Sequence, residues 1–558
     1  MAFALSPSVT VKEIDFTTRI PNVATSIVGT VGNFPWGPCF ERKLTTSESE
    51  LIQYFGTPND VNFADYFTAS EFLRYGNNLL VVRAVAAETA KNAGLIVRKD
   101  DYGGTTLAGT SAYIPNSSSI PTISFDASDK LKFFAKYPGV LGNTNIKIAL
   151  CTASDFDTAK IDTGVSFDAN FSQIPVVGAY DYLDQLAVAV SVKNPINQTW
   201  SIVEKWIVDL DPTAKNGYNK SNYIETIINN NSAYIYCFNN TTLQDLPDSF
   251  ENTLLEDGVD GAPNTGDIQL GYDLFESPEE VDINFIIDGA NNDETIGEYI
   301  SAICTSRMDC VGILTVPFEA VVGAVDLATA IQNCVTYRTT TMNLDNSYVA
   351  LYANWKRMYD KYNEKNRWIP ISGDIAGTFV YTDNVAYPWY ANAGMIRGQL
   401  KNVLQLAINP RRAHRDTLYK YGINPIVGFP GEGNVLFGQK TMQSRPSAFD
   451  RLNIRRLFII LEKSIATAAK YQMFEFNNEF NRNAFKMMVE PFLRYVKSLN
   501  GIEAGFVICD ETNNPGSVRQ NNEFIGDIYI KPMYVSEFIQ LNFIAVGPDV
   551  SFSESLVS

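Results

Sequence analysis

The stretch NIRRLFIILEKSI, residues 453–465, opens the part of the chain whose pattern is easiest to interpret. Its apolar residues recur at intervals of three and four, which places them on one face of an α-helix; they are Ile454, Leu457, Phe458, Leu461 and Ile465. A second helix is predicted after Asn478, with an apolar side made of Phe480, Ala484, Met487 and Met488. Pro491 is expected to interrupt it or to restart a turn, because proline lacks the amide hydrogen that a helix interior needs.

Extended segments follow these two helices. Residues 505–509 come next, and partly alternating β-branched and aromatic residues then predict strands over residues 523–533 and 537–546. The last of these strands contains Phe538, Ile539, Leu541, Phe543 and Val546. It can close a sheet of its own chain or pair with another molecule, and the residues alone leave both pairings open.

Composition narrows the class of protein. A chain of 558 residues is too long for one hydrophobic core, so about three or four domains are expected. A hydrophobic content of 45% predicts packed globular domains. No apolar run is long enough to span a membrane, and the first residues lack the pattern of a secretory signal, so no membrane insertion is expected. A net charge of −18 argues against a nucleic-acid partner, and seven scattered cysteines favour a reducing compartment.

The order of predicted strands, helices and loops along the chain predicts an α/β and α+β multidomain fold. Residues 1–22 form an extended arm in which Val9, Val11, Ile14 and Phe16 are the apolar positions. Strands over 26–34 and 78–85, with helices over 47–55 and 64–75 between them, form a compact α/β beginning. The expected division is an arm over 1–22, a core from 23–90 plus 345–534, a β-rich insertion over 91–217, a central α/β domain over 218–344, and a C-terminal strand or arm over 535–558.

The central domain carries the clearest topological signal. Strands over 281–287 and 311–316, separated by a helix around 295–305, form a β-α-β unit within residues 281–317. Such a unit favours a parallel sheet, because the crossover helix returns the chain to the same edge.

Catalysis and metal binding find little support. The only histidine, His414, lies between Arg412 and Arg415, and no Gly-x-Ser-x-Gly motif supplies a nucleophile for it. Cys304 and Cys310 do not match zinc spacings and have no histidine nearby. We therefore expect no catalytic residue, cofactor or metal, and keep a degenerate hydrolase as a weak alternative.

Gly433–Thr441 comes close to a phosphate-binding loop. The motif G-x-x-x-x-G-K-[ST] is broken by Gln439, which displaces Lys440 by one place. The loop is also apolar where the motif needs free backbone amides facing an anion. A strand flanked by glycine turns is predicted instead.

Charge is distributed unevenly. Between Arg397 and Arg456, eleven lysines and arginines are opposed by three acidic residues, which gives this segment a charge of +8. A solvated basic face would explain this, as would a docking surface for an acidic protein partner, where charge sets register and orientation. The best candidates for docking are Arg445, Arg451, Arg455 and Arg456.

Several segments together resemble contractile tail sheath proteins of myovirus-type bacteriophages, and most strongly those of the T-even type. The similar segments are collinear and touch most of the chain, although 91–217 matches least. They are Thr30–Pro38, Leu51–Gly56, Asp65–Gly76, Leu80–Val85, Ala135–Asn143, Asn229–Ile235, Phe285–Pro317, Arg367–Pro370, Gly433–Thr441 and Asn453–Val546.

The resemblance implies a structural subunit without reaction chemistry, built on a conserved sheath core with a central region that is subtilisin-like in fold only. Such subunits form hexameric rings stacked around a tail tube and contract to drive it through the host envelope. Their terminal arms donate strands to neighbouring subunits; here the matching segments are Val9–Phe16 and Phe538–Val546. The basic residues would then face the tube.

The resemblance also implies partners and a location. The partners would be further copies of the chain, the tail tube protein, and the baseplate and tail terminator proteins, with no nucleic acid. The protein would be assembled in the host cytoplasm and end in the virion. A sheath from a non-viral contractile injection system stays open as the alternative.

Overall fold

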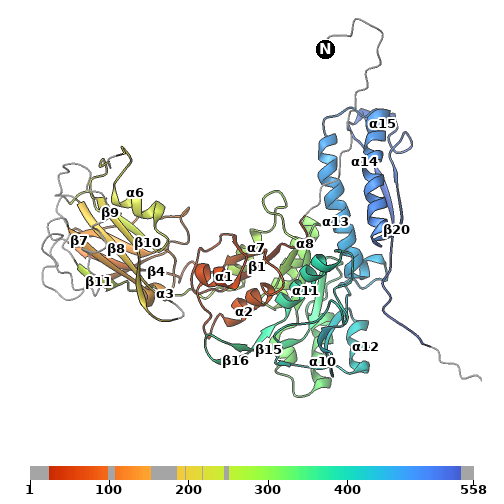
Figure 1. Cartoon of the computed structure of the whole chain (residues 1–558), viewed down its shortest axis with the longest axis horizontal. Helices are drawn as coiled ribbons and strands as arrows, with labels where there is room; N and C mark the ends of the chain where they lie inside the picture. The colour runs from red at the N-terminus through yellow and green to blue at the C-terminus, as the bar shows by residue number, and fades with distance from the viewer. Residues whose placement is uncertain are drawn as a thin grey trace, which may run out of the picture. The chain divides into compact units, whose positions relative to one another are not determined.

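The computed structural model describes residues 24–98, 107–152, 185–194, 197–215, 218–243 and 250–541 (Figure 1). Contacts divide the chain into two compact units at residues 464 and 465. We call Asn22–Ser464 the large unit and the part from Ile465 onward the C-terminal unit, and take each by itself.

An eight-stranded sheet forms the centre of the large unit, in the order β19-β18-β14-β13-β12-β1-β3-β2. Its six inner strands are parallel, and the two edge strands β2 and β19 are antiparallel to their neighbours. Both faces of the inner strands are buried, which suits their Val- and Ile-rich sequences. The strands are β1 Val28–Gly32, β2 Lys43–Thr45, β3 Leu79–Arg83, β12 Phe285–Ile287, β13 Val311–Thr315, β14 Val349–Ala353, β18 Ile423–Phe429 and β19 Gly433–Leu436.

The predicted β-α-β unit is confirmed. β12 and β13 pair in parallel with Phe285 opposite Val311, and α8, Glu294–Arg307, connects them. The side chain of Asp293 starts this helix by accepting a hydrogen bond from the amide of Ile296.

Two hydrophobic clusters cover the two faces of the sheet. Ile286 belongs to one cluster, and its neighbours Phe285 and Ile287 belong to the other, as the alternation of side chains along a strand requires. Helices that contribute to the first are α7 Thr265–Asp273, α8, α10 Leu327–Thr336 and α12 Arg412–Lys420. Helices that contribute to the second are α1 Glu48–Phe55, α2 Phe63–Phe72, α11 Ser372–Val385 and the start of α13.

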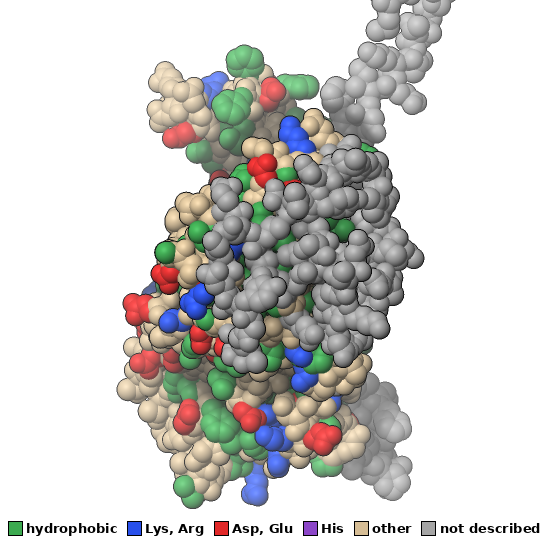
Figure 2. Space-filling model, turned by 90° about the vertical axis from the view of Figure 1, so that its left-hand side faces the viewer, with side chains coloured by type: hydrophobic (Ala, Val, Ile, Leu, Met, Phe, Trp, Pro, Cys, Tyr) green, Lys and Arg blue, Asp and Glu red, His purple; other side chains and the backbone are tan. Residues whose placement is uncertain are grey.

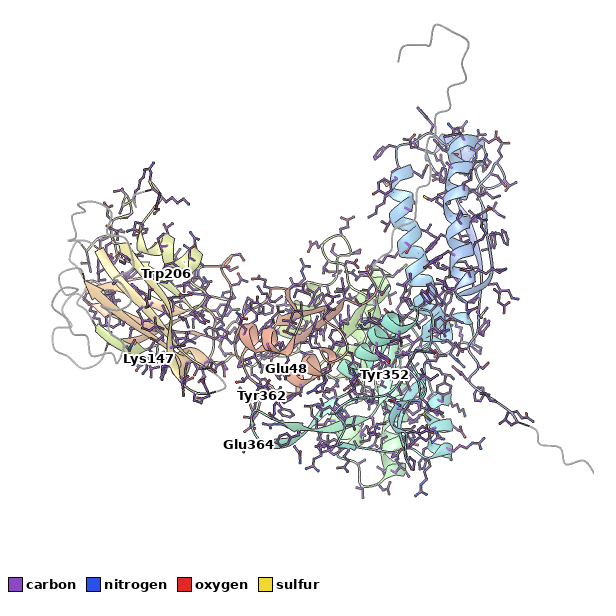
Figure 3. All side chains as sticks on the ribbon, in the orientation of Figure 1. Glu48, Lys147, Trp206, Tyr352, Tyr362 and Glu364 are labelled. Atoms are coloured by element: carbon purple, nitrogen blue, oxygen red, sulfur yellow. The ribbon has the colours of Figure 1, made fainter. Side chains whose placement is uncertain are left out.

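α2 and α11 pack with almost no space between them. A Cβ atom added to Gly373 would lie 2.1 Å from the backbone oxygen of Thr68. Segments before and after α11 in the sequence form a three-stranded sheet in the order β16-β15-β17. Its strands are β15 Trp355–Asp360, β16 Lys365–Pro370 and β17 Gln405–Leu406. Glu48 of α1 and Tyr362 of the β15–β16 turn lie side by side (Figure 3), with the Tyr362 hydroxyl 3.0 Å from a Glu48 carboxylate oxygen.

The β-rich part of the large unit extends further than predicted. Its two four-stranded sheets have the orders β10-β6-β4-β5 and β11-β7-β8-β9. The strands are β4 Asn92–Arg98, β5 Ala108–Ala112, β6 Asp129–Ala135, β7 Ile146–Thr152, β8 Gln185–Lys193, β9 Trp200–Asp209, β10 Ile235–Asn239 and β11 Phe250–Leu254. Two of these, β10 and β11, lie beyond residue 217, so a boundary there divides both sheets. The pairing partners of β10 and β11 lie about a hundred residues earlier, which a local pattern cannot show.

The C-terminal unit confirms the two predicted helices. α13 spans Leu452–Ala469 and so begins within the large unit, and α14 spans Glu479–Ser498 with Asn478 as its capping residue. β20, Ile502–Ile508, pairs antiparallel with β21, Asp527–Pro532, and β20 lies along α14 (Figure 1).

Two details of α14 differ from the prediction. The helix continues through Pro491, which is exposed, so water can satisfy the carbonyl that loses its helical partner. The apolar side was also misplaced, because Phe480 and Met487 are 72% and 75% exposed. The buried side is made of Arg482, Phe485, Met488, Val489, Leu493 and Val496.

Candidate assembly surfaces

The residues considered above for catalysis or metal binding are His414 and the pair Cys304 and Cys310. His414 lies half-buried on α12, and the buried Nδ1 of its ring has no hydrogen-bond partner among the residues that the structure describes. No group of three His, Cys, Asp or Glu residues in the described ranges is placed to hold a metal ion. Cys304 and Cys310 are buried with their Sγ atoms 3.6 Å apart, and burial raises the pKa of the Cys304 thiol. Both belong to the first hydrophobic cluster, as core residues do.

The near phosphate loop is a β-hairpin. β19 pairs with β18 from Ile426 opposite Leu436 to Phe429 opposite Gly433. The Nζ of Lys440 donates to the backbone oxygen of Tyr419 on α12 at 2.9 Å. The predicted strand flanked by glycines is therefore confirmed.

The four basic residues predicted to dock a partner lie in different environments. Arg445 is exposed. Arg451 is partly buried, and its guanidinium lies 2.8 Å from a carboxylate oxygen of Asp450. These two keep charge at the surface of the large unit.

Arg455 and Arg456 instead lie inside the large unit, only 6% and 4% exposed. Arg455 donates to Ser347 Oγ at 2.7 Å and lies over the Phe449 ring at 3.9 Å. Arg456 forms an ion pair with Asp383 at 2.8 Å. Both guanidiniums lie inside the single chain and have contacts there, so the expectation that they face a partner is corrected. This run of basic residues therefore does not form a basic surface as a whole, because α13 places Arg455 and Arg456 in the interior of the large unit.

Strand edges are available in the C-terminal unit. Within the described ranges, β20 and β21 pair with each other and with no other strand, so each has an outer edge. A sheet of two strands is marginal in water and gains stability from further strands. These edges are therefore suited to strand addition from another chain.

The described part of the predicted terminal strand, residues 537–541, is not a strand within this chain. Phe538, Ile539 and Leu541 have no regular secondary structure and are 84%, 79% and 71% exposed. A strand needs a partner, and none of the described strands pairs with them. The other predicted arm residues, Val9, Val11, Ile14, Phe16, Phe543 and Val546, lie outside the described residues.

One apolar surface was not predicted. Five large side chains around the turn between α13 and α14 are at least 62% exposed: Tyr471, Met473, Phe474, Phe476 and Phe480. We call them the hairpin tip. The sequence signal was the density of aromatic residues in YQMFEFNNEF, residues 471–480, outside any helical period. Contiguous exposed apolar side chains of this kind mark interaction sites.

On the face of the molecule shown in Figure 2, basic and acidic side chains are interspersed. No helix within the described ranges is both long enough and apolar enough to cross a membrane.

Comparisons with known proteins identify the family. Three family models match consecutive parts of the chain: the N-terminal region of domain III of a tail sheath protein at residues 25–84, the phage tail sheath protein central domain at 262–442, and the phage tail sheath C-terminal domain at 444–545. The tail sheath protein of Vibrio phage KVP40 is 32% identical, with 99% of each chain covered. That of Enterobacteria phage T4 is also 32% identical over 99% of each chain.

Solved structures show the same fold. The sheath tail protein from Desulfitobacterium hafniense has a TM-score of 0.53 at 12% identity, with 90% of this chain and 94% of that one covered. The helical sheath of the anti-feeding prophage in its contracted state has a TM-score of 0.50 at 13% identity, with 97% and 99% covered.

Open strand edges and exposed apolar side chains, on a mixed α/β multidomain fold, define a structural subunit that assembles with other chains. The chain belongs to the phage tail sheath protein family. By its match to the tail sheath proteins of phages KVP40 and T4, it is a tail sheath protein of the contractile myovirus type.

Proposed function

We propose that this subunit polymerises as stacked hexameric rings around the tail tube, and that contraction of the polymer drives the tube through the host envelope. Subunits would assemble in the host cytoplasm into a polymer that is bounded by the baseplate and the tail terminator. The observation that carries the proposal is the two-stranded sheet β20–β21 with outer edges, followed in the sequence by exposed Phe538, Ile539 and Leu541.

The terminal arms supply the missing strands. Val9–Phe16 and Phe538–Val546 of one subunit would add to the β20–β21 sheets of its neighbours, where backbone groups and apolar side chains find partners. Arms of this kind tether subunits while their bodies rotate and slide, which is the rigid-body change that contraction requires. The energy would be stored at assembly, so neither nucleotide nor enzymatic activity is part of the proposal.

The accessible basic residues are the proposed contacts with the tail tube. Arg445 and Arg451 keep their place as candidates, because an acidic tube surface would set register through charge. Arg455 and Arg456 would act by holding the start of α13 in place. We further propose a subtilisin-like arrangement of the central sheet, a relation of fold alone.

The arm proposal is tested by replacing Phe538, Ile539 and Leu541 with serine. Because these side chains are exposed in the single chain, the variant should keep the thermal unfolding midpoint of the wild type while failing to form tubes in negative-stain micrographs. Val325→Ser is the matched control, since Val325 is 95% exposed in the large unit. Normal tubes from the triple variant would refute strand donation by this segment.

The N-terminal arm is tested separately. Deleting residues 1–20 should leave a folded subunit that does not polymerise. Normal tubes from the truncated chain would show that this arm is dispensable.

Tube docking is tested by co-assembly with a tube protein at physiological salt. If Arg445→Glu weakens co-assembly and Arg42→Glu does not, the docking assignment is supported. If the two variants co-assemble equally well, the contact with the tube lies elsewhere.

A non-viral contractile injection system is the second candidate. The fold shared with the anti-feeding prophage sheath is compatible with it. Genes beside this one would decide, because capsid genes accompany a phage tail and toxin genes accompany an injection system.

A further inference from the structure

A pocket of about 720 Å³ lies in the large unit where β12 and β13 end. Its walls come from the loop that leads into α8, from Pro317 and the residues after β13, and from Trp355 after β14. The carboxyl ends of parallel strands are where open α/β sheets place their ligands. No feature of the arm or tube proposals uses this pocket.

Aromatic side chains form one part of the pocket. Trp355 is 5% exposed, and its ring is held by a 2.8 Å hydrogen bond from Nε1 to the Val316 oxygen. Phe318 packs edge-on against the Trp355 ring, with ring centroids 5.1 Å apart. The Tyr337 hydroxyl donates a hydrogen bond to the backbone oxygen of Asn292. The rings are thus fixed before anything binds, and a cation placed over such faces is attracted by them.

Carboxylates form the rim. Asp293, Glu294 and Glu319 line the pocket and are exposed. Asp293 is occupied in capping α8, and neither Glu294 nor Glu319 forms an ion pair with the described part of the chain. The lining residue Asn292 is 8% exposed, and its Oδ1 has no hydrogen-bond partner among the described residues. Acceptors and aromatic faces together suit a cationic side chain that brings several donors.

The chain itself carries such donors. Arg411 and Arg412 are exposed at the start of α12 and form no ion pair within the described ranges. Two positive charges at a helix N-terminus oppose the helix dipole, at a cost of about 0.3–1 kcal/mol each. The first turn of α12 has no acidic residue to offset them. A guanidinium supplies five donors in a planar fork that also stacks on aromatic rings, which matches this pocket better than an ammonium.

We propose that the pocket receives an arginine, Arg411 or Arg412, from a second copy of this chain. The contact rests on the proposed polymer, and it adds a body-to-body connection to the arm contacts. Because the pocket and α12 are different surfaces, the contact is heterologous, and heterologous contacts that do not close a ring generate open helical polymers.

Charge exchange tests the contact. Glu294→Arg with Glu319→Arg places like charges together and should raise the protein concentration needed for tube growth at least about tenfold, followed by light scattering and microscopy. Arg411→Glu with Arg412→Glu should do the same, and the variant carrying all four changes should recover. Asp293 is left unchanged because it caps α8. The matched controls are Glu298→Arg, exposed on α8 outside the pocket, and Lys420→Glu, exposed at the end of α12.

Each outcome decides between specific alternatives. Recovery in the fourfold variant, with controls near the wild type, supports the contact. Tube growth by either double variant at the wild-type concentration overturns it. Failure of the fourfold variant to recover, although its unfolding midpoint matches the wild type, also overturns the pairing of this pocket with α12. Absence of tubes from the wild-type chain would refute the polymer itself, a failure distinguishable from that of the pocket.

Discussion

The large unit and the C-terminal unit bury their side chains in opposite ways. In the large unit even charged groups lie inside: Lys356 is fully buried, and its Nζ lies 2.7 Å from Glu71 and 2.8 Å from Asp374, both equally buried. In the C-terminal unit large apolar side chains lie outside, among them Phe474, 101% exposed, and Phe538. The large unit therefore holds an ion triad in its interior, and the C-terminal unit keeps large aromatic side chains in water.

The difference indicates how work is divided within a sheath subunit. A buried ion triad resists deformation, because separating its members leaves charges without water or partner. Exposed aromatic side chains cost little in the free subunit and gain free energy when a neighbour covers them. The large unit is therefore expected to remain rigid, and the C-terminal unit to gain its full stability in the polymer.

The largest effect is expected from Lys356→Ala. Removing the cation leaves Glu71 and Asp374 buried without it, which should lower the free energy of unfolding by about 3–5 kcal/mol. Denaturant unfolding of the unassembled chain measures this. The control is Lys361→Ala, because the ion pair of Lys361 with Glu48 is about half exposed and should contribute about 0–1 kcal/mol. Equal losses in the two variants would contradict the interior role of the triad.

Arg456→Ala should follow closely. It leaves Asp383 buried without its cation and removes contacts with the Phe285 and Phe379 rings, at a cost of about 2–4 kcal/mol. Arg445→Ala, at an exposed position, should change the unfolding free energy by less than about 0.5 kcal/mol. If the two variants were equally stable, Arg456 would be free to serve as the docking residue it was first expected to be.

A smaller effect should depend on pH, with opposite sign for two buried carboxyl groups of the large unit and one exposed carboxyl group of the C-terminal unit. Burial raises the pKa of Asp65 to about 6 and of Asp288 to about 7 in the large unit. Their folded states hold protons more tightly than the unfolded chain, so their contribution is full below pH about 4 and is lost as pH rises to about 7. In the C-terminal unit a hydrogen bond from Thr512 lowers the pKa of Asp510, so that contribution is lost as pH falls.

Unfolding midpoints between pH 4 and 8 check this sign. Asp65→Asn with Asp288→Asn should flatten the fall in stability between pH 5 and 8, by on the order of 1–3 kcal/mol. Asp510→Asn should leave that interval unchanged. A pH profile that is the same in the double variant and the wild type would contradict the assigned shifts.

The smallest effect on the free subunit is expected at the hairpin tip. Phe474→Ser with Phe476→Ser should change the unfolding free energy by less than about 0.5 kcal/mol, because both side chains are already in water. The same pair should weaken assembly of the sheath or its binding to a partner, measured by tube yield. A loss of subunit stability above 2 kcal/mol would show that these rings pack within the chain.

Local patterns in the sequence determined the elements of this protein. The three- and four-residue spacing from Ile454 to Ile465 fixed the position of α13, and Asn478 fixed the start of α14. The β-α-β pattern around α8 indicated a parallel sheet, because a crossover helix returns the chain to the edge where the first strand began, and the second strand then runs in the same direction. The resemblance of collinear segments pointed to the sheath family before any fold was known.

Only the tertiary structure decided which of these residues face the solvent. Arg455 and Arg456 belong to the most basic stretch of the chain, yet α13 places them against Ser347 and Asp383, residues far away in the sequence. The extent of the β-rich part, the exposure of Phe480 and the open edges of β20 and β21 were decided in the same way. Burial and strand pairing depend on contacts between distant segments, and a periodicity read along the chain carries no record of them.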